Sequence, residues 1–216
     1  MDIDQSSLQG AHEKKAKSFE GIYDDAGEAD KLPWAHSEPT PFLGEVTRAR
    51  EKPGRALDIG CGSGVDSVYL AEQGWDVTSL DFMADAQQWT GDRAKKAGVN
   101  LHLVQQDVTA WDNTDTFDLI LDAGVLHNMK PVQKPEYRKR ILRWLAPDGV
   151  YILCHFEKRH MFDWRPIGPR RVSRTNIQKM FAPELTEKNY HQKISTGLPI
   201  IIGPSLALST YWFRRA

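Results

Sequence analysis

Three glycines within five residues give this sequence its most distinctive chemical signal. Residues 58–64 read Asp-Ile-Gly-Cys-Gly-Ser-Gly, directly after a short apolar run and directly before a segment with helical spacing. In open α/β sheets, ligands bind beyond the carboxyl ends of the strands. Glycines at that point let the backbone turn tightly and approach a ligand closely. The spacing therefore indicates a loop that binds a nucleotide or nucleoside.

Two classes of cofactor compete for such a loop. A dinucleotide fingerprint is G-x-G-x-x-G, and counted from Gly60 its third glycine would stand at position 65, which is Val65. Here the third glycine, Gly64, comes one residue early, and a carboxylate, Asp58, stands two residues before the first glycine. A negative side chain suits a cationic amino-acid group better than a pyrophosphate. The loop therefore favours S-adenosylmethionine, which carries an ammonium and a sulfonium and no phosphate, over NAD and a reductase function.

Two further carboxylates stand where the second and third strands are expected to end. Asp81 follows Gly64 by 17 residues and can accept hydrogen bonds from both ribose hydroxyls, a feature that NAD sites share. Asp107, in the Gln-Asp-Val stretch at 106–108, can accept a hydrogen bond from an adenine amino group. The alternative for Asp107 is an ordinary turn or cap residue. Together the two carboxylates support a bound nucleoside.

If the loop binds S-adenosylmethionine, the methyl group on its sulfonium needs an acceptor molecule. Several basic and imidazole side chains are candidates to contact that acceptor. Methyl transfer from a sulfonium is an in-line displacement, so the protein supplies orientation and a dry pocket. A base is needed only if the acceptor carries a proton. His127 is the first candidate to orient the acceptor or take that proton, and the alternative is a histidine that hydrogen-bonds backbone at a helix start. His36 and His155 are further candidate acceptor contacts. Arg170 and Arg171 either recognise an anionic acceptor or form an ordinary solvated face.

The strands and helices that position these residues are predicted by alternating patterns in the sequence. Short apolar runs predict strands at 56–59, 75–80, 101–105, 117–121 and 150–156. Helical spacing fills the intervals at 65–73, 84–97 and 134–145. After a helix that opens near Ser173, two strand-like segments follow, the last at 206–213. The expected fold is α/β: a doubly wound, Rossmann-like, seven-stranded and mostly parallel sheet with one antiparallel C-terminal strand.

Composition narrows the class of protein further. Lys and Arg number 28 and Asp and Glu 29, so the strong basic excess of a general nucleic-acid binder is missing. The two cysteines, Cys61 and Cys154, form no CxxC pair, and no Cys/His cluster has zinc spacing. The sequence has no run of 18 apolar residues and no apolar signal core near Met1. We therefore expect a cytoplasmic, metal-free monomer or homodimer whose partner is a small molecule, with no nucleic-acid or membrane partner.

Five segments in combination resemble the motifs of class I S-adenosylmethionine-dependent methyltransferases. They lie at 55–64, 80–81, 107–108, 117–122 and 145–149, the last reading Leu-Ala-Pro-Asp-Gly. We expect a single methyltransferase domain over 1–216. Residues 1–50 would form a helical lid and entry segment, and residues 51–216 the cofactor-binding core with a substrate loop near 157–172.

The expected cofactor contacts lie on the motif segments, on the lid, or beside them. They are Tyr23, Trp34, Asp58, Gly60, Cys61, Gly62, Gly64, Asp81, Phe82, Asp107, Val108 and Asp122. Catechol-type members of the class carry an Asp-Asn pair after the fifth strand, where this chain has Cys-His-Phe-Glu at 154–157. Members that methylate amino groups on polymers carry Asn/Asp-Pro-Pro-Tyr after the fourth strand, where this chain has Asp-Ala-Gly-Val at 122–125. The resemblance thus implies neither a metal nor a polymer substrate.

A narrower resemblance is to thiopurine, tellurite-resistance and heterocyclic-toxin methyltransferases. It is carried by Pro-Trp at 33–34 with the prolines at 39 and 41, by Asp-Ala-Gly-Val-Leu-His at 122–127, and by Pro-Arg-Arg-Val-Ser at 169–173. The segment at 35–37 reads Ala-His-Ser and departs from that group's Asp-Ile-Gly. The resemblance implies methylation of a small aromatic or heterocyclic metabolite at N, O or S. The alternatives are detoxification of a thiol, halide or metalloid acceptor, and a non-catalytic regulator that binds S-adenosylmethionine.

Overall fold

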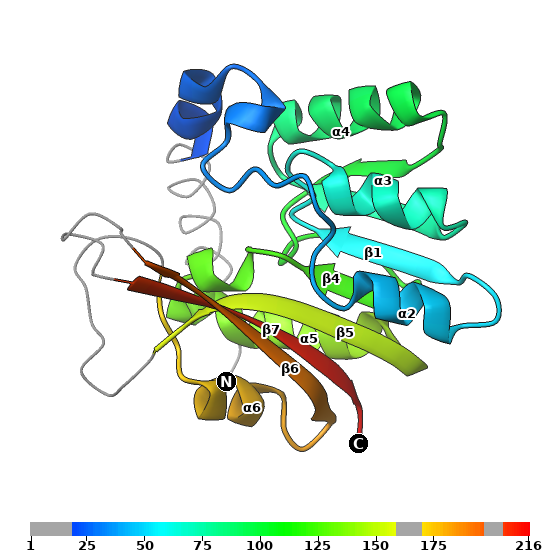
Figure 1. The fold of residues 1–216 in the computed structure, drawn as a ribbon. Helices are drawn as coiled ribbons and strands as arrows, with labels where there is room; N and C mark the ends of the chain where they lie inside the picture. Colours follow the sequence, from blue (N-terminus) through cyan, green and yellow to red (C-terminus); the bar gives the residue numbers. More distant parts are fainter. Residues whose placement is uncertain (1–18, 159–169, 197–204) are drawn as a thin grey trace.

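A seven-stranded sheet with the order β3-β2-β1-β4-β5-β7-β6 forms the centre of the molecule (Figure 1). The computed structural model describes residues 19–158, 170–196 and 205–216. The strands are β1 (Arg55–Ile59), β2 (Asp76–Asp81), β3 (His102–Gln105), β4 (Phe117–Asp122), β5 (Leu145–Glu157), β6 (Leu185–Thr196) and β7 (Ser205–Arg215). Strands β1 to β5 pair in parallel, and β7 runs antiparallel between β5 and β6. The predicted fold is confirmed, including the single antiparallel strand.

Helices cover both faces of this sheet. They are α2 (Leu43–Ala49), α3 (Val65–Glu72), α4 (Ala84–Ala97), α5 (Lys134–Trp144) and α6 (Arg174–Phe181), with 3-10 turns η1 (Ala29–Lys31), η2 (Leu126–Asn128) and η3 (Pro131–Gln133). Helices α2 and α3 bury Leu43, Val46 and Leu70 against one face. Helices α5 and α6 lie on the opposite face (Figure 1) and share its apolar core. Apolar residues on both faces explain why the central strands are continuous apolar runs.

The turn predicted before the fifth strand is a bulge at the start of that strand. Phe117 of β4 pairs with Leu145, and Leu119 pairs with Val150. The segment of β5 between these two pairs is therefore longer than the matching segment of β4. Its extra residues, 146–149, contain the Pro-Asp-Gly sequence and loop out of the hydrogen-bonded ladder. The strand consequently begins at Leu145, where the sequence analysis expected the helix to end.

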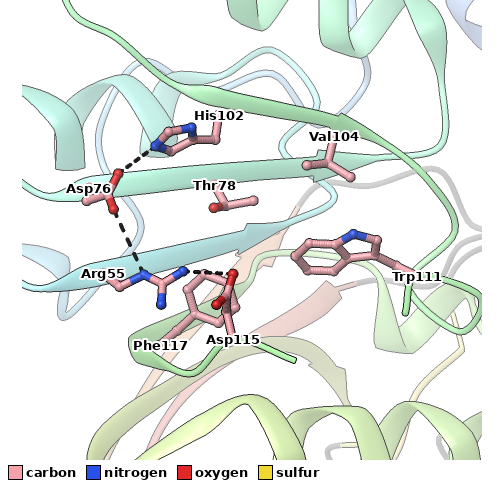
Figure 2. A pocket seen from close by; sticks show the side chains of 8 residues that line it. All are labelled: Arg55, Asp76, Thr78, His102, Val104, Trp111, Asp115 and Phe117. Atoms are coloured by element: carbon pink, nitrogen blue, oxygen red, sulfur yellow. Dashed lines mark hydrogen bonds and ion pairs between the residues drawn. The ribbon is translucent and has the colours of Figure 1, made fainter. Parts of the chain in front are cut away.

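The carboxyl and amino ends of the parallel strands form two different edges. The strand order reverses between β1 and β4, so the glycine loop after β1 lies at the topological switch point, where ligands of such sheets bind. Residues 106–116, all of them described, join β3 to β4 without a helix and run from the carboxyl edge of the sheet back to its amino edge. A groove of about 420 Å³ opens there, lined by Arg55, Asp76, Thr78, His102, Val104, Trp111, Asp115 and Phe117 (Figure 2).

None of the described helices is long and apolar enough to cross a membrane. The expected lid at 1–50 is described from residue 19 onward, and residues 19–26 are helical. Of the expected substrate loop at 157–172, positions 159–169 lie outside the described residues. Its two ends lie side by side, because the backbone N–H of Lys158 donates to Val172 and that of Val172 donates to Phe156.

Candidate active site

The glycine loop adopts a backbone that other residues would find strained. Gly60, Gly62 and Gly64 have φ values of 73°, 52° and 76°, in the left-handed region. A Cβ on Gly60 would lie 2.3 Å from a Val125 methyl, and one on Gly64 would lie 2.8 Å from Thr90. The sequence thus needs glycine here for conformation and for close packing. The result is a loop that joins β1 to the start of α3 at the switch point.

Asp58 is a buried carboxyl directly beneath this loop. Ser67 donates its hydroxyl hydrogen to Asp58 over 2.6 Å, and Ser79 donates to Ser67 over 2.8 Å. Burial, with an added contribution from the Asp66 charge, raises the pKa of Asp58 to about 8. Within the described residues Asp58 forms no ion pair, and it would be stabilised in its charged form by a cation brought to it. This fits the ammonium of an amino-acid moiety.

A small pocket lies above Asp58, between the loop and the entry segment. Its lining residues are Trp34, His36, Asp58, Gly60, Cys61, Gly62, Ser63, Asp66 and Ala123. The indole nitrogen of Trp34 lies 3.6 Å from the position that a Cβ on Gly62 would occupy. The structure therefore brings together residues of the lid, the glycine loop and the start of the loop after β4, as the expected cofactor site requires.

Asp66 is a residue of this pocket that the sequence analysis did not identify. Its two carboxylate oxygens accept hydrogen bonds from the backbone N–H of Thr40 over 2.7 Å and from the Thr40 hydroxyl over 2.6 Å. These bonds hold the entry segment, with His36, against the start of α3. In the sequence, Asp66 has the ordinary signature of an acidic residue in the first turn of a helix, and Thr40, its partner, lies 26 positions away. No local pattern could have identified it.

The two carboxylates expected to contact the nucleoside lie at the ends of β2 and β3. Asp81 accepts hydrogen bonds from the backbone N–H groups of Gly62 (3.1 Å) and Met83 (3.0 Å), so it orients the glycine loop directly. One oxygen of Asp107 accepts from the backbone and hydroxyl of Thr109. That is the turn geometry that the sequence left open for Asp107. Contacts of both residues with a nucleoside remain predictions, as do those of the adjoining Val108.

Asp122 organises the loop that carries His127. Its side chain has no exposed surface and accepts hydrogen bonds from the backbone N–H groups of residues 124, 125 and 126. The hydroxyl of Tyr137 also donates to it over 2.5 Å. Its carboxylate is thus engaged within its own loop and with α5. The expected cofactor contact of Asp122 remains a prediction.

Aromatic side chains of the lid lie on the start of α4. Tyr23 stacks on Trp89 with ring centroids 5.3 Å apart, and Phe19 lies between Trp34 (5.6 Å) and Phe82 (5.8 Å). The Arg93 guanidinium donates to the backbone of Ser63 and to Asp30, which ties lid and glycine loop together. The lid, with its Tyr23 and Trp34, therefore lies at the expected cofactor site.

Two histidines meet beyond the end of β4, where His127 follows that strand and His155 lies near the end of β5. The His127 ring lies 5.6 Å from the His155 ring and 4.7 Å from the Phe156 ring, edge to face in both cases. Burial lowers the pKa of His155 to about 4. His36 is in the pocket above Asp58. Burial, with a smaller contribution from the positive charge of the exposed Arg170, lowers the pKa of Lys134.

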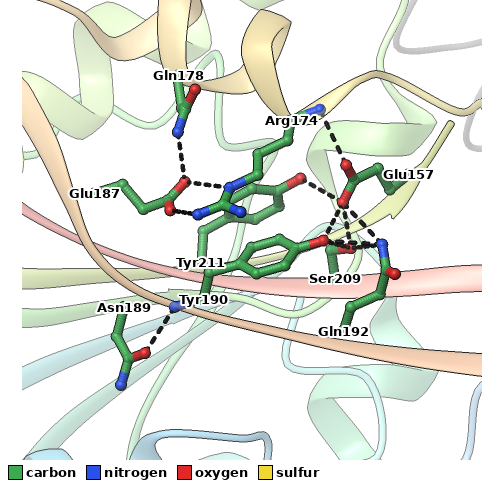
Figure 3. Close-up of polar contacts among 9 residues, drawn as sticks. All are labelled: Glu157, Arg174, Gln178, Glu187, Asn189, Tyr190, Gln192, Ser209 and Tyr211. Carbon is green, nitrogen blue, oxygen red and sulfur yellow. Dashed lines mark hydrogen bonds and ion pairs between the residues drawn. The ribbon is translucent and has the colours of Figure 1, made fainter. Parts of the chain in front are cut away.

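A polar cluster surrounds Glu157, the last residue of β5, and was not predicted from the sequence (Figure 3). One carboxylate oxygen of Glu157 accepts hydrogen bonds from Tyr190 (2.6 Å), Ser209 (2.6 Å), Gln192 (3.2 Å) and Tyr211 (3.3 Å). The other accepts from the backbone N–H of Arg174 at the start of α6. The cluster joins the end of β5 to the middle of β6 and β7, beside the base of the expected substrate loop. Its partners lie 17 to 54 positions from Glu157, so the sequence offered no local signal.

No group of three or more metal-ligating side chains occurs in the described ranges. The donor set at the glycine loop instead fits a nucleoside that carries an amino-acid moiety. A buried carboxyl without a cation lies beneath the loop, and a second carboxylate lies at the end of the neighbouring strand β2.

Comparisons with known proteins agree with this assignment. A family model described as "Methyltransferase domain" matches residues 56–149. The chain is 29% identical over 187 residues to a "Probable thiol methyltransferase 2" of Arabidopsis thaliana, covering 83% of this chain and 79% of that protein. It is also 29% identical over 154 residues to a 2-heptyl-1-hydroxyquinolin-4(1H)-one methyltransferase of Mycobacteroides abscessus, covering 70% of this chain and 67% of that protein.

A solved structure shares the fold over nearly the whole chain. It is the Burkholderia thailandensis 1,6-didemethyltoxoflavin-N1-methyltransferase with bound 1,6-didemethyltoxoflavin and S-adenosylhomocysteine, with a TM-score of 0.70 and 23% identity over 94% of this chain and 90% of that one. Fold, glycine loop and matched family agree with one another. The chain is an S-adenosylmethionine-dependent methyltransferase, and its fold and glycine loop are similar to those of class I enzymes of this kind.

Proposed function

We propose that this enzyme transfers the methyl group to nitrogen, oxygen or sulfur of a small aromatic or heterocyclic metabolite. The observation that carries the proposal is the contact of His127 with His155 and Phe156 at the ends of β4 and β5. His127 is carried by the loop that begins at Ala123, a lining residue of the pocket above Asp58, and His155 and Phe156 pack against it from β5. Flat walls with few polar atoms suit an aromatic ring.

The cofactor is expected to lie along the carboxyl ends of β1, β2 and β3. Asp58 would face the ammonium, Asp81 the ribose hydroxyls and Asp107 the adenine. The glycines let the backbone approach, and Cys61, Phe82 and Val108 would pack around the nucleoside. When bound, S-adenosylmethionine supplies an electrophilic methyl group on a sulfonium.

The chain's own contribution is to orient the acceptor and exclude water. Tyr23 and Trp34 would cover the bound cofactor, because the lid already packs on the glycine loop and α4. A dry site strengthens the electrostatic interactions within it. His127 would take the proton of a hydroxyl or ring N–H acceptor. His36 and, for anionic acceptors, Arg170 and Arg171 would add polar contacts.

A second candidate is methylation of a thiol or a small anion. The similarity to a probable thiol methyltransferase of Arabidopsis thaliana favours it. Such acceptors are already nucleophilic, so proximity suffices and no base is required. The two candidates therefore predict different roles for His127.

The test measures S-adenosylhomocysteine release by mass spectrometry with four acceptors: 4-hydroxyquinoline, 4-nitrothiophenol, thiocyanate and iodide. We expect turnover of the heterocycle and an approximately 100-fold loss in His127→Ala, the scale of lost general-base catalysis. We also expect the rate to rise with pH as the imidazole loses its proton. The matched control is His102→Ala, which removes an exposed histidine at the opposite edge of the sheet and should keep the full rate. If His127→Ala keeps a near-native rate and a flat pH profile, His127 is structural and the anionic acceptors are favoured.

A further inference from the structure

His155 lies beside the proposed acceptor site and is completely buried. Leu153 of β5 pairs with Asp122 at the end of β4, and His155 follows two residues later. Its side chain has no exposed surface, and its ring stands at 87° to the ring of His127. Its position beyond the paired end of β4 places it at the ligand-binding edge of the sheet.

The hydrogen bonding of the His155 ring determines which nitrogen carries the hydrogen. Nδ1 lies 2.8 Å from the carbonyl oxygen of Phe156, and a carbonyl oxygen can only accept, so Nδ1 is the donor. The low pKa of His155, caused mainly by burial, keeps the ring neutral near pH 7 with that single hydrogen. Nε2 therefore presents a lone pair and can only accept.

No donor lies within hydrogen-bond distance of Nε2 in the part of the chain that the structure describes. An unpaired buried acceptor costs folding free energy. Buried groups of this kind are uncommon and call for an explanation, such as a partner outside the protein chain. The edge of the sheet where ligands bind makes the acceptor molecule the fitting partner.

We propose that His155 Nε2 accepts a hydrogen bond from an N–H or O–H group of the methyl acceptor, and thereby selects protic heterocycles over anions without a hydrogen. This inference rests on the proposed function and narrows its substrate class. Thiocyanate, iodide and thiolates have no hydrogen to donate, and their negative charge would face the lone pair. A site built to hydrogen-bond a substrate discriminates strongly against analogues that lack the matching group.

The first experiment determines the protonation state and tautomer of the His155 ring in the full-length protein with bound S-adenosylhomocysteine. Long-range proton–nitrogen NMR at pH 7 should show His155 as the neutral Nδ1–H form. Adding 4-hydroxyquinoline should shift the Nε2 resonance, whereas its matched analogue 4-methoxyquinoline, which has no N–H or O–H, should not. A charged His155, an Nε2–H form, or equal shifts with both ligands would overturn the proposal.

The second experiment compares His155→Leu, which removes the acceptor atom, with His155→Gln, which keeps an acceptor oxygen near the same place. We expect kcat/KM for 4-hydroxyquinoline to fall about 10- to 100-fold in the leucine variant and to recover largely in the glutamine variant. Affinity for S-adenosylhomocysteine should stay unchanged in both, which also shows that they fold.

The two experiments separate failure of the inference from failure of the proposed function. Preferred methylation of thiocyanate or iodide by the native enzyme would overturn the selection by His155 and leave a methyltransferase of small molecules. If none of the four acceptors is methylated, the proposed aromatic substrate class is wrong, and the NMR result still decides the state of His155.

Discussion

The two edges of the sheet hold charged residues in opposite ways. At the amino edge the Arg55 guanidinium lies 3.0 Å from Asp115 and 3.9 Å from Asp76, and His102 lies 2.8 Å from Asp76 (Figure 2). These charges compensate one another in contact with solvent. At the carboxyl edge, Asp58 is buried beneath the glycine loop, and the described residues place no cation against it.

This difference shows that the volume of a pocket does not by itself identify the cofactor site. The groove at the amino edge measures about 420 Å³, and the pocket above Asp58 only about 50 Å³. The larger groove lies where no helix joins β3 to β4. Its charged side chains already form ion pairs with one another, so they do not require a charged ligand. The smaller one contains a carboxyl that only a cationic ligand would stabilise in its charged form.

The largest expected effect on cofactor affinity comes from removing a carboxylate at the carboxyl edge. Asp81→Ala should weaken binding of S-adenosylhomocysteine by about 1–3 kcal/mol, the usual cost of hydrogen-bond partners left unpaired. It deletes the expected ribose contact and also the two bonds to the glycine loop. Isothermal titration calorimetry measures the loss. Unchanged affinity would show that the ribose lies elsewhere.

Next in size is a pH dependence that Asp58 confers on the free protein. Its pKa is raised from an unfolded value near 3.9 to about 8, so between these values the folded state binds more protons than the unfolded state. The free energy of unfolding that Asp58 contributes is therefore fully present below about pH 4 and is lost as the pH rises to about 8. Comparing urea denaturation of the wild type with Asp58→Asn from pH 5 to 8 isolates this slope. Parallel curves for the two proteins would contradict the raised pKa.

The smallest effect is expected at the amino edge. Arg55→Ala removes an exposed guanidinium whose ion pairs should contribute at most about 1 kcal/mol. Its stability loss should shrink further with added salt, and its turnover should equal that of the wild type. A loss of turnover without a loss of stability would show that the groove takes part in function.

Much of this architecture could be predicted from the sequence. The spacing of apolar residues and the glycines that follow them predicted the strands β1 to β5. The strands β1, β4 and β5 are largely buried and read as apolar runs, whereas the edge strand β3 is mostly exposed. The glycine loop could be recognised because its backbone requires glycine at Gly60, Gly62 and Gly64.

The residues that the sequence did not reveal depend on distant partners. Asp66 is explained by Thr40, and Glu157 by Tyr190, Ser209 and Tyr211, all far apart along the chain. Asp122 was expected at the cofactor, a contact that stays a prediction, and its bonds to its own loop and to Tyr137 were not foreseen. A carboxylate at the end of a strand has the same sequence signature whether or not it organises its own loop.

The most direct test of the account is calorimetry of cofactor binding at pH 7 in buffers of different ionisation heat. Because burial raises the pKa of Asp58, we expect its carboxyl to be largely protonated in the free protein, and a bound ammonium favours the charged form. S-adenosylhomocysteine should therefore bind and release protons, Asp58→Asn should abolish that release, and NAD should show no binding. Tight binding of NAD without binding of S-adenosylhomocysteine, or binding that releases no protons, would contradict it.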